Sequence, residues 1–213
     1  MLRRRTFLAG VLAFLWIAIA AGARAQEIVD GLAARVESDV ILLSEVRELG
    51  AYQQLFSGKR EPDAQLLDRL IDQWIVRTEA EASRYPLPSS GDVNLELEKL
   101  KTGYPSSQLF EQRCKEAGLS EAALRRIVTE QLYLTGYLDS RFRPVVQIDA
   151  QTIDEFYEKT VVPLAKAKGE TPPTLEGARE TIRELLIQRG INEQSDRWLN
   201  ERRSRLHIEK ETA

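Results

Sequence analysis

His207 and Cys114 are the side chains whose chemistry would be easiest to recognise, because the sequence contains one histidine and one cysteine. A Ser-His-Asp or Cys-His site needs a histidine as its base, so any such site would have to include His207. His207 lies in the segment 205–209, RLHIE, whose alternating apolar and polar residues are typical of a half-buried strand. With Leu206 and Ile208 on the buried face, we expect the ring of His207 to face solvent. Cys114 lies in a helical pattern, where we expect a small half-buried residue. Neither position predicts catalysis or metal binding.

Acidic side chains are the other group that could do chemistry, because two suitably spaced carboxylates can hydrolyse a glycosidic bond. Pairs such as Glu45/Glu48 and Glu96/Glu98 fall in segments with helical spacing, where we expect surface charge. The sequence has no glycine-rich phosphate-binding loop. We therefore expect no catalytic, cofactor-binding or metal-binding residues and no enzymatic activity. An enzyme of unrecognised type is the alternative.

The first 25 residues have the pattern of an export signal. Arg3–Arg5 form a basic start, Leu8–Ala21 is an apolar run, and Ala23-Arg24-Ala25 fits a cleavage site. The run is shorter than the ~20 residues of a typical membrane span, so we expect no stable membrane insertion. The pattern predicts a periplasmic protein cleaved near Ala25. RRTFL at 4–8 also resembles a twin-arginine signal, which leaves both the secretory and the twin-arginine routes open.

The charge of the chain argues against a nucleic-acid partner. Without the four arginines of the first 25 residues, 26 basic residues face 33 acidic ones, a formal charge of −7. Binding a phosphate backbone requires a surplus of Lys and Arg. A single cysteine also excludes an internal disulfide, so the exported protein would depend on its core alone for stability.

The sequence predicts a mainly α-helical fold with a small sheet. Strands are expected at 27–36 and 40–42, around a turn at 37–39. Helical spacing predicts helices over 45–56, 64–82, 92–102, 107–117, 121–142, 150–159 and 174–203. The expected N-caps are Ser44, Asp63, Ser106, Ser120 and Asp149. Gly118 fits a helix C-terminus with positive φ, and Gly190 is a possible weak point of the last helix. The segment 161–173, with three prolines and a glycine, is expected to be a linker.

The two N-terminal strands need a partner, because an isolated two-stranded ribbon is marginal in water. The segment 205–209 is the one other strand signal, so we expect the chain ends to pair. That strand could pair within its own chain or exchange with a second copy, which would give a homodimer. Trp198 is expected to anchor the last helix against the N-terminal ribbon.

Binding is the activity that these patterns leave open. A helical shell can hold an extended or partly folded polypeptide in a crevice lined by apolar and aromatic side chains. The chain has no methionine after Met1, so adaptability would have to come from Leu, Tyr, Phe and motion between lobes. Trp74 and Leu132 have apolar neighbours at helical spacing and are expected in the core. The candidate polypeptide-binding residues are Tyr104, Phe110, Tyr133, Tyr137 and Phe142.

Five segments, taken in order, resemble the chaperone module of periplasmic SurA-type proteins, a family of chaperones linked to peptidyl-prolyl isomerase domains. They are VDGLAARVESDVILLSEV at 29–46, LLDRLIDQWIV at 66–76, LSEAALRRIVTEQLYL at 119–134, IDAQTIDEFYE at 148–158 and ARETIRELLIQRGINEQSDRWLNERRSRLHIE at 178–209. The resemblance implies a mainly α, multi-helix SurA/trigger-factor-like module. Its small antiparallel sheet would consist of the N-terminal ribbon and the C-terminal strand.

The resemblance also implies a domain organisation. A helical region at 26–160 and a closing helix and strand at 174–213 would complete one module. The linker 161–173 would stand where the family usually carries a parvulin-type isomerase domain. A parvulin site has paired histidines and walls of Met and Phe, which this chain cannot supply. The implied function is a non-enzymatic holdase, without a cofactor, for unfolded polypeptides that include outer-membrane proteins. The alternative is an assembly subunit that binds one specific partner protein, such as a separate isomerase.

Overall fold

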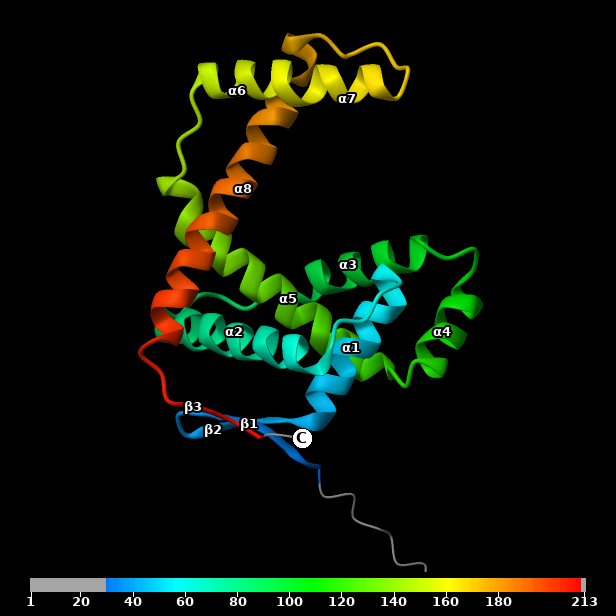
Figure 1. Ribbon diagram of the computed structural model, residues 1–213. Coiled ribbons are helices and arrows are strands. Elements are labelled where there is room, and N and C mark those ends of the chain that lie inside the picture. Colours follow the sequence, from blue (N-terminus) through cyan, green and yellow to red (C-terminus); the bar gives the residue numbers. More distant parts are fainter. Residues whose placement is uncertain (1–29, 212–213) are drawn as a thin grey trace, which may run out of the picture. The chain divides into compact units, whose positions relative to one another are not determined.

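The chain is mainly helical, and segments near its two ends meet in a small antiparallel sheet (Figure 1). The computed structural model describes residues 30–211, so the predicted export signal and the start of the first predicted strand lie outside it. The strands are β1 (Leu32–Val36), β2 (Asp39–Leu42) and β3 (Ile208–Lys210). The helices are α1 (Leu43–Ser57), α2 (Asp63–Ala82), α3 (Ser90–Thr102), α4 (Ser107–Glu116), α5 (Glu121–Phe142), α6 (Ala150–Phe156), α7 (Val162–Ala167) and α8 (Leu175–Arg203). The predicted fold class, mainly α with a small sheet, is confirmed.

β1 is the central strand of the sheet, between β2 and β3. Arg35 lies opposite Val40 on one side and opposite Glu209 on the other. The backbone N–H of Glu37 donates to the carbonyl of His207 at 2.9 Å and extends the pairing by one residue. The predicted pairing of the chain ends is therefore confirmed, and it occurs within one chain.

The first core lies between the sheet and helices α1, α2, α5 and α8. Leu66 and Ile71 of α2 are fully buried in it, and Val36 of β1 lies in the same cluster. The indole N–H of Trp74 donates to Asp39 Oδ2 at 2.8 Å and ties α2 to β2. The ring of Trp198 packs at 5.9 Å from that of Phe142, so the closing helix is anchored through an aromatic pair.

Ion pairs fix the end of α8 and β3 to α2, and we call this set of contacts the clasp. The guanidinium of Arg203 bonds to Asp68 Oδ1 and Asp72 Oδ1, each at 2.6 Å. Lys210 of β3 bonds to Asp68 Oδ1 at 2.7 Å. Burial raises the pKa of Asp72 although Arg203 opposes this shift. The clasp therefore places charge that is partly desolvated where the two ends of the chain meet.

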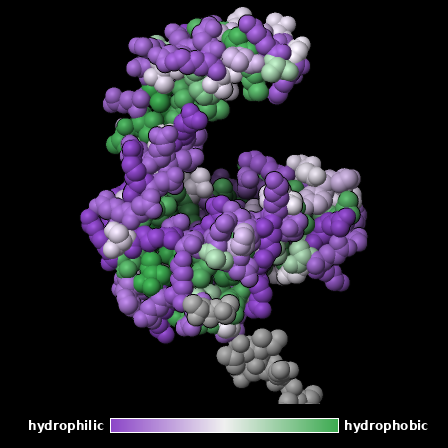
Figure 2. Space-filling model, viewed as in Figure 1, coloured by the Kyte–Doolittle hydropathy of each residue, from purple (hydrophilic) through white to green (hydrophobic). Residues whose placement is uncertain are grey.

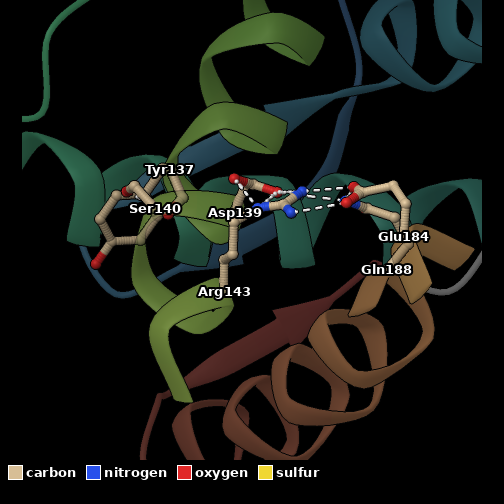
Figure 3. A network of polar contacts seen from close by, with 6 residues as sticks. All are labelled: Tyr137, Asp139, Ser140, Arg143, Glu184 and Gln188. Atoms are coloured by element: carbon tan, nitrogen blue, oxygen red, sulfur yellow. Dashed lines mark hydrogen bonds and ion pairs between the residues drawn. The ribbon is translucent and has the colours of Figure 1, made fainter. Parts of the chain in front are cut away.

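A second ion-pair network joins α5 to α8 (Figure 3). Arg143 follows α5 in a short 3₁₀ turn, Arg143–Val145, and its Nη2 lies 2.9 Å from Asp139 Oδ1. The same guanidinium bonds to both carboxylate oxygens of Glu184, at 2.7 and 3.0 Å. Gln188 donates to Glu184 Oε1 at 2.9 Å. These bonds, with Arg143 as the largest cause, lower the pKa of Glu184 to about 2.

The segment predicted as a linker is partly helical. After α6 the chain continues through a π-helical turn, Tyr157–Val161, directly into α7. Pro163 lies where the π-helical turn passes into α7, and it has no N–H to donate to the preceding helical turn. Gly169, with φ of 72°, ends the helix. The part of 161–173 without regular structure is therefore shorter than expected, and the hydroxyl of Tyr157 holds it by donating to the carbonyl of Pro173 at 2.7 Å.

Three helices begin earlier than predicted. α1 begins at Leu43, before the expected cap Ser44, because the carboxylate of Glu45 accepts the N–H of Leu42 at 2.8 Å. α2 begins at Asp63 itself, whose charge suits the first turn of a helix. α3 begins at Ser90, two residues early. The predicted caps Ser106, Ser120 and Asp149 are confirmed.

Gly190 does not interrupt α8. A Cβ atom at this position would lie 2.6 Å from Cγ1 of Val146, in the segment between α5 and α6. The glycine therefore permits a close approach of that segment. Gly190, predicted as a possible weak point of the last helix, is instead a position where the helix packs closely against another segment. Within residues 30–211, no helix combines the length and apolarity needed to cross a lipid bilayer.

Candidate functional site

An apolar pocket of about 660 Å³ lies between α3, α4, the turn that follows α4, and the start of α5. We call it the three-helix pocket. Such a volume is in the range of sites that bind ligands with several apolar groups. Its apolar floor consists of Leu97, Phe110, Cys114, Leu119 and Leu124.

Local backbone signals position the floor. Ser106 accepts the N–H of Leu109 at 3.2 Å and starts α4. At the other end the N–H of Leu119 donates to the carbonyl of Cys114 at 2.9 Å, and the N–H of Gly118 donates to that of Lys115 at 3.0 Å. This is a Schellman motif, and Gly118 supplies the required positive φ of 74°. The motif reverses the chain and places the side chain of Leu119 in the floor beside Cys114.

Aromatic contacts hold the floor against α1. The ring of Phe110 lies 5.3 Å from that of Tyr104, in an edge-to-face arrangement, and 6.2 Å from that of Phe56. The hydroxyl of Tyr104 donates to the carbonyl of Leu55 at 3.1 Å. Edge-to-face pairs add free energy beyond that of burial alone. The pocket is therefore preformed, because its floor is packed from below.

The rim of the pocket carries both signs of charge. Each wall helix contributes one acid followed by one base, three or four residues later: Glu98 and Lys101 on α3, Glu111 and Lys115 on α4, and Glu121 and Arg125 on α5. Lys101 pairs with Glu98 at 2.8 Å, and Arg125 donates to Asn94 Oδ1 at 2.8 Å. The rim has no net formal charge, so the rim itself favours neither a positively nor a negatively charged ligand.

The thiol of Cys114 contributes apolar surface. Cys114 is buried, and this burial raises the pKa of its thiol. A thiol with a raised pKa stays protonated near neutral pH and is a poor nucleophile. The pocket is therefore suited to holding apolar groups, and its one sulfur atom is not activated.

The five predicted binding residues do not line one groove. Tyr104 and Phe110 belong to the cluster beneath the three-helix pocket. Tyr133, Tyr137 and Phe142 are buried in the first core, with at most 8% of their surface exposed. The structure therefore divides the five candidates between two separate clusters.

The reason lies in which face of α5 meets its neighbours. The rings of Tyr133 and Tyr137 pack at 5.8 and 5.7 Å from that of Tyr85, in the turn after α2. The turn therefore covers both tyrosine rings, and the helical spacing of α5 cannot predict a contact with so distant a segment. Trp74 is in the core, as expected, whereas Leu132 is only partly buried and packs against the cluster beneath the three-helix pocket. The prediction missed Leu97, Leu119 and Leu124, although the Ser106, Gly118 and Ser120 signals around α4 indicated a tight turn of the chain there.

A smaller pocket of about 140 Å³ lies between β2, α1, α2 and α5 and is more polar. Arg77 Nη1 lies 3.2 Å from Glu130 Oε1 on its wall. Burial raises the pKa of Glu130, although Arg77 opposes this shift. His207 lies elsewhere, exposed on the approach to β3, with Nε2 2.9 Å from Glu209 Oε1. In the part of the chain that the structure describes, no three His, Cys, Asp or Glu side chains are grouped to hold a metal ion.

An exposed apolar surface lies apart from both pockets. Figure 2 shows hydrophobic residues on the visible face where the 3₁₀ turn after α5 meets α8. Val145 in that turn is 61% exposed, and Leu185 on α8 is 49% exposed. Exposed apolar surface of this kind can mark a contact with another protein.

Comparison with known proteins adds no relative. No protein-family model matches the sequence. No curated protein matches it either.

Proposed function

We propose that the protein is a non-enzymatic periplasmic chaperone, a holdase that binds unfolded or partly folded polypeptides through the three-helix pocket. The observation that carries this proposal is the preformed apolar floor beneath a rim without net charge. Such a site accepts apolar side chains of many sequences and discriminates little by charge. Outer-membrane proteins in transit are the proposed clients, since the first 25 residues have the pattern of an export signal and the chain resembles the SurA chaperone module.

The expected affinity suits transient binding. Burying one large apolar side chain contributes roughly 1.5–3 kcal/mol. Two or three such side chains contribute about 3–9 kcal/mol before the cost of association and ordering is subtracted, so we expect dissociation constants above about 1 μM. A client bound this weakly is protected from aggregation and still released.

The direct test uses the mature chain, residues 26–213, with a chemically denatured client. We expect the protein to slow aggregation, measured by light scattering. We expect no acceleration of prolyl isomerisation in a tetrapeptide assay, since the chain lacks the residues of a parvulin site. Absence of any suppression at a large molar excess would contradict the proposal.

A second candidate is an assembly subunit that binds one specific folded partner, and the exposed Val145 and Leu185 favour it. The two functions respond differently to one change. A Val145→Asn/Leu185→Asn variant would lose a specific partner but would retain holdase activity. A tight stoichiometric complex with one partner, lost in this variant, together with no affinity for unfolded chains, would establish the second function.

A further inference from the structure

We infer that the three-helix pocket takes an amphipathic helical segment of a client, recognised by its apolar stripe and by flanking charges of both signs. This inference rests on the proposed function and narrows it, because it specifies the conformation in which the client is held.

The backbone of the pocket walls is the first argument. The lining residues belong to helices or to the turn after α4, and none belongs to a strand. The amides of Gly118 and Leu119 already donate to Lys115 and Cys114. The first turn of α5 leaves a few amides uncapped, fewer than the ladder of a paired strand requires.

An extended client would therefore bury its own N–H and C=O groups here without partners. Each such group would lose its hydrogen bonds to water, at a cost in free energy. A helical client bonds its backbone internally and presents side chains alone. The pocket thus favours the helix-in-groove mode of recognition over the addition of a strand.

The spacing of the floor fits the same occupant. Phe110 and Cys114 lie four residues apart on α4 and form one apolar stripe. Leu97 of α3 and Leu124 of α5 complete the floor from the neighbouring helices. Apolar side chains three or four residues apart on a docked helix have the matching period.

Charge at the rim is complementary to a helix of mixed charge. Among residues 30–211, Lys115 has no ion-pair partner, and Glu111 and Glu121 interact with Lys101 without forming a close ion pair, so all three can pair with an opposite charge on a client. A client helix with both Lys and Glu beside its apolar stripe can pair its Lys with the rim glutamates and its Glu with Lys115. A purely basic or purely acidic helix leaves one sign unmatched. We expect the affinity for the mixed helix to change little with salt, because the rim has no net charge.

The test compares two labelled peptides of the same composition, about four helical turns long. One has Leu at helical spacing between Lys and Glu, and the other has the same residues in strand-like alternation. Fluorescence anisotropy with the mature chain should give at least about tenfold tighter binding of the helical peptide. Leu97→Gln, on the floor, should weaken it about tenfold or more. Leu95→Gln, at a 59% exposed position of the same helix, should change it less than about twofold.

Cys114 provides an independent readout, because it is the one cysteine of the chain and lies on the floor. Bound helical peptide should slow its modification by N-ethylmaleimide. A Cys114→Ala/Leu95→Cys variant should be modified at the same rate with and without peptide. Where the thiol reacts too slowly in the free protein, the anisotropy series decides.

The outcomes separate this inference from the proposed function. If the two peptides bind equally well, or if Leu97→Gln does not change the affinity, the inference of a helical occupant is wrong, although the protein could still act as a holdase. Failure to suppress aggregation of any client overturns the proposed function itself. Tighter binding of the helical peptide, sensitive to Leu97→Gln, supports the inference.

Discussion

At the scale of single residues, the candidate site depends on one glycine. Gly118 has φ of 74° in the turn that places Leu119 on the floor of the three-helix pocket. No atom lies within 4 Å of where its Cβ would stand. A substitution there therefore changes backbone strain alone and creates no steric clash.

Gly118→Ala is expected to lower the free energy of unfolding by about 1 kcal/mol, because alanine is strained at positive φ. Urea denaturation measures this change. Gly91→Ala is the control, since Gly91 has ordinary helical geometry in α3 and its Cβ would have room. The control should leave stability unchanged or raise it by less than about 1 kcal/mol. Equal effects of the two substitutions would contradict the role assigned to Gly118.

At the scale of elements, the sequence predicted most helix caps but did not predict which segments pack against each other. Ser106, Ser120 and Asp149 could be assigned as caps because a cap is formed with backbone amides a few residues away. Ser44 is not a cap because the helix already begins at Leu43, where Glu45 accepts the N–H of Leu42. The burial of Tyr133 and Tyr137 could not be predicted, because the turn at Tyr85 covers them through a contact between distant segments.

The contact between α8 and the segment after α5 gives a prediction of its own. Gly190→Ala should lower the free energy of unfolding by about 1–3 kcal/mol, despite the higher helix propensity of alanine, because the new Cβ overlaps Val146. Adding Val146→Ala should recover most of the loss. A Gly190→Ala protein as stable as the wild type would show that the close approach is not required.

The network of Arg143 predicts a pH dependence. The pKa of Glu184 is lowered from 4.5 to about 2 in the folded protein. Its bond with Arg143 therefore stabilises the fold fully at pH values above the pKa that Glu184 has in the unfolded chain. That contribution is lost as the pH falls from 4.5 toward 2. The difference in unfolding free energy between wild type and Glu184→Gln should therefore shrink across this window. A difference that stays constant from neutral to acid pH would contradict this account.

At the scale of the whole molecule, the sheet that joins the chain ends was predictable because the N-terminal ribbon had one candidate partner strand. Its pairing within one chain could not be predicted, since exchange with a second copy satisfies the same strands. The clasp explains what favours closure in this structure: Arg203 and Lys210 both bond to carboxylates of α2. The aromatic candidates are divided between two hydrophobic clusters, and this division depends on how the whole chain folds.

Arg203→Met is expected to destabilise the protein by about 1.5–3 kcal/mol, because it leaves partly buried Asp72 without its partner and Asp68 with Lys210 alone. Arg205→Met is the matched control, since Arg205 pairs on the surface with Glu201 and should contribute less than about 1 kcal/mol. Thermal unfolding followed by circular dichroism measures both. Similar losses for the two variants would contradict the assigned role of the clasp.

The central claim, that the three-helix pocket holds aggregation-prone polypeptides, is tested most directly by comparing two leucines of α3. The measurement is the concentration of mature protein that halves the aggregation of a denatured client. Leu97→Gln, in the floor, should raise that concentration about tenfold, whereas Leu95→Gln should leave it within about twofold of wild type, with both variants folded by circular dichroism. Equal suppression by the wild type and both variants would contradict the claim.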